Sequence, residues 1–202
     1  MSRTIDPFFS KRLVYRAVED NSDDEEFIHL IQRDAEAQSG SSFSLLVPEN
    51  KKASNKWREA LLERTLMSAI VCLPVTEAGH TTATPIGVVA LKGISAGHEK
   101  NRVSYISIDV LDSWRGRGYG GEAIEWALGY GFQMAGLHRI GIETFSHNAG
   151  AMCLYEKLGF VREGCKREEI WFNGRWEDYI TYGMLEGEWR DKMAREGRKW
   201  RE

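Results

Sequence analysis

The chain passes from a strand to a helix at residues 109–122, and this stretch, which reads Asp-Val-Leu-Asp-Ser-Trp-Arg-Gly-Arg-Gly-Tyr-Gly-Gly-Glu, decides the fold. Apolar residues alternate before it and recur at helical spacing after it. Glycines let a backbone approach a ligand closely, and the first turn of a helix offers unpaired N–H groups at the positive end of its dipole. Because Arg115 and Arg117 add positive charge, the stretch predicts a phosphate-binding turn.

The glycine spacing alone leaves several interpretations open. Gly116, Gly118 and Gly121 satisfy the dinucleotide fingerprint G-x-G-x-x-G, and Glu143 ends a following strand, where a ribose-binding acid would stand. Against a dinucleotide-binding domain, residues 112–115 separate the strand from the first glycine, and only one strand–helix–strand unit follows. A Walker P-loop is excluded because no Gly-Lys-Ser/Thr follows the glycines. A tight turn without a ligand is the third interpretation.

Hydrophobic periodicity divides the rest of the chain into strands and helices. Alternation predicts a strand at 12–17, an antiparallel meander at 66–73, 85–94 and 102–111, and a strand at 139–145. Helical spacing predicts helices after the acidic run 19–26 and at 55–66, 120–136 and 148–158, with a long loop at 38–52. Asn173-Gly174 predicts a hairpin between strands at 169–172 and 176–184. We therefore expect an α+β fold, in which about four helices flank a mixed central sheet of about six to seven strands that ends in a C-terminal β-hairpin.

Composition favours a single domain over residues 1–202. Of 202 residues, 42% are hydrophobic, which suffices for one core. The net charge of −3 argues against nucleic-acid or membrane binding through overall basicity, and the longest apolar stretch, 66–75, is half the length of a membrane span. Three cysteines without C-x-x-C spacing indicate reduced thiols and no metal site, and we see no secretory signal. We expect a cytoplasmic protein.

A second motif favours a ligand other than a dinucleotide. Arg115, Gly118 and Gly120 satisfy R-x-x-G-x-G, and about 28 residues later the chain reads Asn-Ala-Gly-Ala-Met-Cys-Leu-Tyr-Glu-Lys-Leu-Gly-Phe, at 148–160. Together these motifs resemble those of the GNAT superfamily of acyl-coenzyme A-dependent N-acetyltransferases.

The resemblance extends beyond the motifs to the order of elements. It covers a core of about 12–189 and leaves a basic tail at 190–202, which we expect to be an exposed helix or disordered. The C-terminal hairpin, with Asn173-Gly174-Arg175-Trp176, Asp178 and Glu188-Trp189, resembles the branch that includes ribosomal-protein N-terminal and small-amine acetyltransferases.

The resemblance implies that an acetyl group passes directly from acetyl-CoA to a primary amine. It implies that backbone N–H groups of Gly116–Gly121 hold the pyrophosphate and that the pantetheine arm runs along the strand before them. The cofactor-binding residues implied are Ile108, Val110, Arg115, Gly116, Arg117, Gly118, Tyr119, Gly120, Gly121, Asn148 and Tyr155. Asn148 also suits a plain helix N-cap.

The implied reaction needs a base, because a lysine-like amine is mostly protonated at neutral pH. The resemblance places Glu143 at a base position, and Asp109 on the neighbouring strand is the rival, with a chain of waters as a third option. Tyr155 stands at the general-acid position, from which it would protonate the departing thiolate. A buried core tyrosine is the alternative role for Tyr155.

The acceptor amine is left open. In this fold the loop at 38–52 and the final hairpin select it, and the hairpin offers the aromatic residues Trp171, Phe172, Trp176, Tyr179 and Tyr182 and the carboxylates Glu168, Glu169, Glu177 and Asp178. A polyamine, an amino sugar and a protein N-terminus are all compatible with these residues. Many relatives are dimers, so a homodimer is also compatible. The alternative function is a non-catalytic protein of the same fold that binds acetyl-CoA as a sensor.

Overall fold

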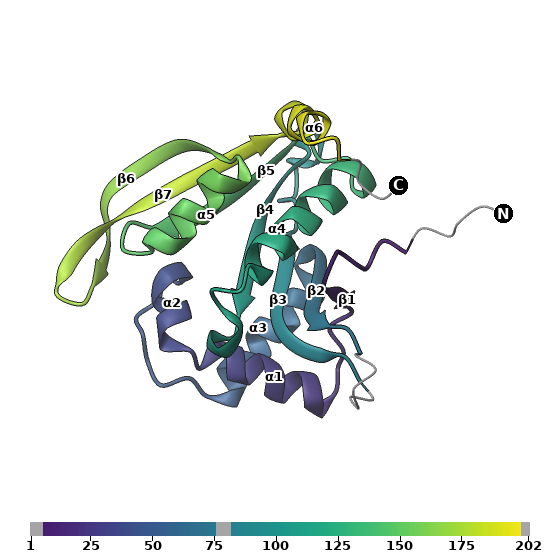
Figure 1. Cartoon of the computed structure of the whole chain (residues 1–202). Helices are drawn as coiled ribbons and strands as arrows, with labels where there is room; N and C mark the ends of the chain where they lie inside the picture. The colour runs from purple at the N-terminus through teal and green to yellow at the C-terminus, as the bar shows by residue number, and fades with distance from the viewer. Residues whose placement is uncertain (1–5, 76–81, 199–202) are drawn as a thin grey trace.

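The computed structural model describes residues 6–75 and 82–198 (Figure 1). The strands are β1 Val14–Arg16, β2 Thr65–Leu73, β3 Thr84–Lys92, β4 Val103–Val110, β5 Arg139–Phe145, β6 Val161–Phe172 and β7 Arg175–Leu185. The α-helices are α1 Ser22–Gln32, α2 Ala35–Ser41, α3 Lys51–Glu63, α4 Tyr119–Gly129, α5 Ala149–Leu158 and α6 Glu186–Arg195. Short 3-10 turns lie at Glu99–Asn101 and Asp112–Trp114, and a π-helical turn, Tyr130–Met134, continues α4.

The described strands form one mixed sheet in the order β1-β2-β3-β4-β5-β7-β6. The predicted meander is confirmed, because β2, β3 and β4 pair antiparallel in sequence. The predicted hairpin is also confirmed: β6 and β7 pair antiparallel, and Asn173 and Gly174 turn with φ of 46° and 82°. Positive φ at both positions is what a two-residue hairpin turn requires.

Helices cover both faces of the sheet, and alternation along β3 shows how. Val89 and Leu91 join the core beneath α4 and α5, whereas Val88 and Ala90 join a second core beneath α1 and α3. In Figure 1, α4 and α5 lie in front of the sheet, and α2 lies beside the N-terminal end of α5. We call the face covered by α4 and α5 the front face and the opposite one the back face.

Strands β4 and β5 diverge soon after they begin. Within the described part of the chain they are the one parallel pair, and they are paired only where Val103–Tyr105 lies beside Arg139–Gly141. At the last of these pairs the ring of Tyr105 covers Gly141, since a Cβ added there would lie 2.5 Å from the ring. Beyond this point the carboxyl halves of the strands are separate, which opens the sheet.

One helix was not predicted, and another begins earlier than predicted. Helix α2 occupies the start of the predicted loop 38–52, where serine and glycine are poor helix formers, and it begins because Asp34 accepts a hydrogen bond from the N–H of Ala37 at 3.0 Å. Helix α3 likewise begins at Lys51, earlier than predicted, behind the cap Asn50. The true loop is shortened to 42–50.

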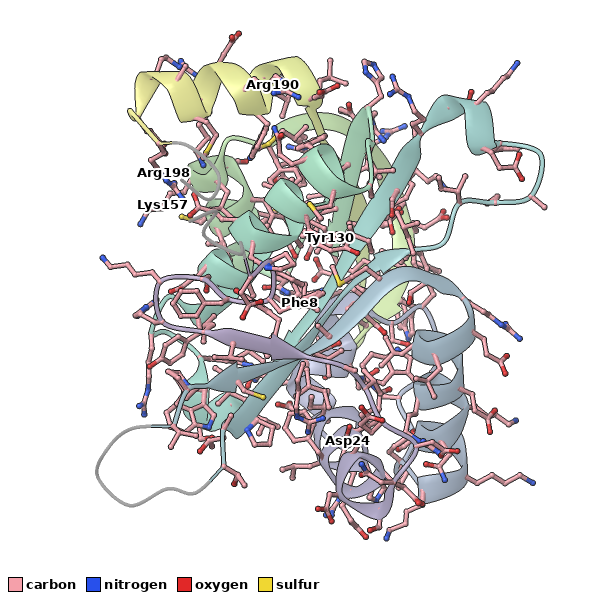
Figure 2. All side chains as sticks on the ribbon, turned by 90° about the vertical axis from the view of Figure 1, so that its right-hand side faces the viewer. Phe8, Asp24, Tyr130, Lys157, Arg190 and Arg198 are labelled. Carbon is pink, nitrogen blue, oxygen red and sulfur yellow. The ribbon has the colours of Figure 1, made fainter. Side chains whose placement is uncertain are left out.

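Helix α6 crosses the boundary expected between the core and the tail. Trp189 is buried against Phe132 from this helix, and Arg198 folds back onto α4, where it binds Glu125 at 3.0 Å (Figure 2). The basic segment is therefore packed through Arg198, while residues 199–202 of the expected tail lie outside the described residues.

Strand β6 is longer than predicted. It begins at Val161 and not near residue 169, and most of its side chains are exposed and charged, so it lacks the apolar alternation by which a strand is recognised. It is the edge strand of the sheet, and it is irregular where Glu168 has a φ of 53°. Charges and bulges are common on exposed edges.

We expect Gly87→Ala to lower the free energy of unfolding by about 2 kcal/mol, because the added Cβ would lie 2.4 Å from the carbonyl oxygen of Asp109. Urea unfolding followed by circular dichroism measures this loss. Gly187→Ala is the matched control, since nothing lies within 4 Å of a Cβ at that position. An unchanged stability for Gly87→Ala would contradict the close approach of β3 to β4.

Candidate active site

The divergence of β4 and β5 contains a cavity of about 630 Å³. It runs between the end of β4, the glycine turn before α4, the end of β5, the start of α5, and helix α2. All but one of the predicted site residues line it: Ile108, Asp109, Val110, Arg115, Gly116, Gly118, Tyr119, Gly120, Gly121, Glu143, Asn148 and Tyr155. The exception is Arg117.

The glycine turn presents free backbone donors to the cavity. Gly116 and Gly118 have φ of 71° and 81°, and the first hydrogen bond of α4 runs from the N–H of Glu122 to the oxygen of Gly118 at 3.2 Å. The N–H groups of residues 119–121 precede that bond, so they are available to an anion at the positive end of the helix. This geometry suits the predicted phosphate site.

The two arginines of the turn are placed differently from expectation. The guanidinium of Arg115 ion-pairs with Asp34 at the start of α2, and its Nε donates to the oxygen of Val110 at 2.9 Å. Arg117 is exposed and lies over the ring of Trp114, 4.9 Å from its centroid. Arg115 therefore ties α2 to the end of β4, and the donors free to hold a phosphate are backbone groups.

Sequence reasoning missed a third arginine. Arg12 binds Glu122, with 2.7 Å between Nε and Oε2, and donates to the oxygen of Arg117 at 3.1 Å. Its guanidinium also lies 4.6 Å from the centroid of the Tyr119 ring. It holds the glycine turn from the side of β1, and since it is about 100 residues away in sequence, no local pattern pointed to it.

Asp109 and Tyr155 line the same cavity and interact electrostatically. Burial raises the pKa of Asp109 to about 6, which outweighs the opposite effect of the charge on Arg115. Burial and the charge of Asp109 raise the pKa of Tyr155, which is only 7% exposed. Within the described residues, the hydroxyl of Tyr155 and the carboxylate of Asp109 make no hydrogen bond, so both are free for a ligand.

Glu143 is engaged on the back face. Its carboxylate lies 3.4 Å from Nζ of Lys92, and it hydrogen-bonds to the hydroxyl of Tyr179, whose pKa is raised by burial and by this bond. Lys92 ends β3, and Tyr179 lies in β7. No local sequence pattern predicts this pairing, because it joins three strands.

Helix α2 covers one side of the cavity. Asn148 caps α5 by accepting from the N–H of Ala151 at 3.1 Å, and Gly40 of α2 packs so closely on it that an added Cβ would lie 2.6 Å from Nδ2. Nε2 of His147 lies 2.9 Å from the oxygen of Ser39. With Arg115 at its other end, α2 is therefore fixed across the opening.

The aromatic residues and carboxylates of the hairpin contribute little to the cavity. Of its five aromatic residues only Tyr179 lines the cavity, and the four hairpin carboxylates do not. Trp171 and Trp176 pack against each other in the exposed tip, with 5.1 Å between ring centroids, and Tyr182 is buried in the front core. In place of the hairpin, Phe43 contributes the second ring, 5.1 Å from that of Tyr179.

Residues 12–161 match the family model described as acetyltransferase (GNAT) domain. The chain belongs to the GNAT acetyltransferase family. This settles the choice between the interpretations of the glycine turn: the expected GNAT fold is confirmed, and the dinucleotide-binding domain is excluded. A sheet opened between two parallel strands, with a glycine turn beside the opening, is the GNAT architecture in this chain.

Curated relatives share about half of the chain. Spermidine N(1)-acetyltransferase of Vibrio cholerae is 33% identical over 107 residues, which are 53% of this chain and 60% of that protein. The ribosomal protein uS5 alanine N-acetyltransferase of Escherichia coli is 26% identical over 104 residues, 52% of this chain and 53% of that protein. The aligned part thus spans between half and two thirds of the length of these relatives.

Solved structures match over nearly the whole chain. The spermidine N-acetyltransferase of Vibrio cholerae in complex with CoA and spermine superposes with a TM-score of 0.72 at 25% identity, covering 89% of this chain and 98% of that one. A GNAT-family acetyltransferase from Bacillus anthracis gives 0.71 at 20% identity, with the same coverage.

Over residues 6–75 and 82–198, no helix is long and apolar enough to cross a membrane. In the same part of the chain, no three His, Cys, Asp or Glu side chains gather closely enough to hold a metal ion.

We expect Asp109→Asn to raise the melting temperature by about 3 °C at pH 8 and by less at pH 5. The folded pKa of Asp109 lies above the ordinary value of 3.8, so stability is lost as pH rises from about 4 to above 6, and the amide removes that loss. Calorimetry at both pH values measures it, with the exposed Asp112→Asn as control. An equal gain at both values would argue against the raised pKa.

Proposed function

We propose that this protein transfers an acetyl group from acetyl-CoA to a primary amine. One observation carries the proposal: a single cavity joins the free N–H groups of the glycine turn to an unpaired carboxylate, Asp109, and an unpaired phenol, Tyr155. The first end suits a pyrophosphate, and the second suits proton transfer. Family membership supports the same reaction.

The cosubstrate has a defined path in this proposal. The backbone N–H groups of residues 119–121 hold the pyrophosphate, without a contribution from the side chain of Arg117. The pantetheine arm then follows the unpaired half of β4 past Ile108 and Val110, which line the cavity. Unpaired strand backbone offers the hydrogen-bonding groups that an amide-containing arm needs.

The reaction moves protons at both the nitrogen and the sulfur. The acceptor ammonium gives a proton to the carboxylate of Asp109, and the neutral nitrogen attacks the thioester carbonyl carbon. The carbon–sulfur bond then breaks, and Tyr155 donates its hydroxyl proton to the leaving thiolate. The acetylated nitrogen gives its second, surplus proton to the Tyr155 phenolate, and Asp109 releases its proton to solvent, so both groups return to their starting states. A tyrosine with a raised pKa stays protonated until it is used, which is the state a general acid requires.

We propose Asp109 as the base in preference to Glu143. A pKa of about 6 keeps Asp109 ionised at neutral pH yet close enough to neutrality to accept a proton effectively. Glu143 is already held by Lys92 and Tyr179. Its position suits orientation of the acceptor.

The proposal extends to the surroundings of the site. The acceptor enters from the back face, where Phe43, Tyr179 and Lys92 line the cavity. Cys72, Cys153 and Cys165 are free thiols, as suits the reducing cytoplasm. We propose that the catalytic unit comprises the predicted core of residues 12–189 together with the rest of α6, to Arg195.

We expect Gly118→Trp to abolish binding of acetyl-CoA, because the indole would fill the approach to the N–H groups of the turn. Isothermal calorimetry with acetyl-CoA, and with NADH as the control ligand, measures it. Gly97→Trp is the matched variant, since Gly97 has a φ of 83° against 81° for Gly118 and does not line the cavity. If the wild-type protein bound NADH instead of acetyl-CoA, or bound neither ligand, the proposal would be contradicted.

We expect Tyr155→Phe to lower kcat at least about tenfold and to leave the Kd of acetyl-CoA unchanged, because only the proton donor is removed. Release of free CoA thiol, measured with the best amine of a panel, gives kcat. Tyr130→Phe is the control, since Tyr130 packs on Trp126 outside the cavity. Normal turnover by Tyr155→Phe would exclude the tyrosine as the acid.

A further inference from the structure

The acceptor end of the cavity carries a lysine that no part of the proposed reaction uses. Lys92 stands at the end of β3, its side chain is 54% exposed, and its Nζ lies 3.4 Å from Oε2 of Glu143. The same Nζ lies 5.8 Å from the centroid of the Tyr105 ring, the ring at which β4 and β5 separate. The ammonium group is therefore fixed at the back-face opening by a carboxylate and an aromatic ring.

Lys92 neutralises the carboxylate of Glu143 at the acceptor end of the cavity. Among the described residues, three carboxylates line the cavity: Glu36, Asp109 and Glu143. Glu36 lies 3.8 Å from Arg115, the charge of Arg115 also acts on Asp109, and Glu143 is held by Lys92. Arg115 is shared with Asp34. Lys92 pairs, in the described part of the chain, with Glu143 alone, so Glu143 is the carboxylate of the cavity that has a cation of its own. Asp109 is needed for the reacting amine.

A second ammonium group on the acceptor would find no free carboxylate among the described residues at this end of the cavity. It would meet Lys92 where a free carboxylate would be needed. Three rings of the cavity wall, Phe43, Phe145 and Tyr179, pack against one another nearby. Like charges about 6 Å apart in a partly exposed site disfavour binding by about tenfold. An apolar group beside the reacting amine would pack on the rings instead.

We propose that the acceptor carries a single ammonium group on an apolar body and that Lys92 is the specificity-determining residue that rejects polycations. The inference rests on the proposed function, because it concerns the amine that this cavity acetylates. It sets the chain apart from the relatives named for spermidine, although they share its fold.

Two amines of equal length show whether the site prefers an acceptor with one ammonium group or one with two. Pentylamine and 1,5-diaminopentane differ only in the second amino group, so the ratio of their kcat/KM values, taken per amino group, reports the cost of a second charge. We expect the wild-type protein to prefer pentylamine by at least about tenfold. Lys92→Met removes the charge, keeps most of the length of the side chain and frees Glu143, so the ratio should fall about tenfold, mainly through a lower KM for the diamine.

Lys100→Met is the matched control, because Lys100 is exposed and does not line the cavity. Lys92→Gln repeats the test if the methionine variant is unstable. A wild-type preference for the diamine, a ratio unchanged by Lys92→Met, or no turnover of either amine by a protein that binds acetyl-CoA would each overturn the proposal. Failure to bind acetyl-CoA in calorimetry would instead overturn the proposed function.

Discussion

The rest of the site depends on the early end of the pairing between β4 and β5. Parallel neighbours in a sheet normally stay hydrogen-bonded along their length, but here the ladder ends where the Tyr105 ring covers Gly141. Because both strands continue as far as Val110 and Phe145 supported on their outer sides by β3 and β7, the sheet remains intact around an opening. That opening connects the two faces of the sheet.

Different chemistry meets at each end of the opening. On the front face, the glycine turn and the start of α4 present backbone N–H groups, held from behind by Arg12 and beside by the Arg115–Asp34 pair. On the back face, Glu143, Lys92 and a cluster of aromatic rings form the walls, and α2 closes one side. Asp109 and Tyr155 lie between, where burial shifts both pKa values upward. The two ends and the proton carriers therefore share one cavity.

Sequence patterns predicted the parts of this arrangement that depend on residues close together in the chain. The meander, the glycine turn and the start of α5 rest on alternation, on Gly116 and Gly118, and on the cap Asn148, and the structure has all of them. Contacts between distant segments were out of reach: neither the Lys92–Glu143 pair, 51 residues apart, nor the Arg115–Asp34 pair leaves a pattern in sequence. Helix α2 was missed because packing on Asn148, and not propensity, stabilises it.

A crystal structure with bound CoA tests the central claim most directly. The account predicts a pyrophosphate on the N–H groups of residues 119–121, a pantetheine arm along the unpaired half of β4, and a sulfur atom close to Asp109 and the Tyr155 hydroxyl. The ion pair of Arg115 with Asp34 should persist in the complex. A CoA molecule bound outside the opening, or a sulfur atom remote from both residues, would contradict the claim that the divergence of β4 and β5 creates the active site.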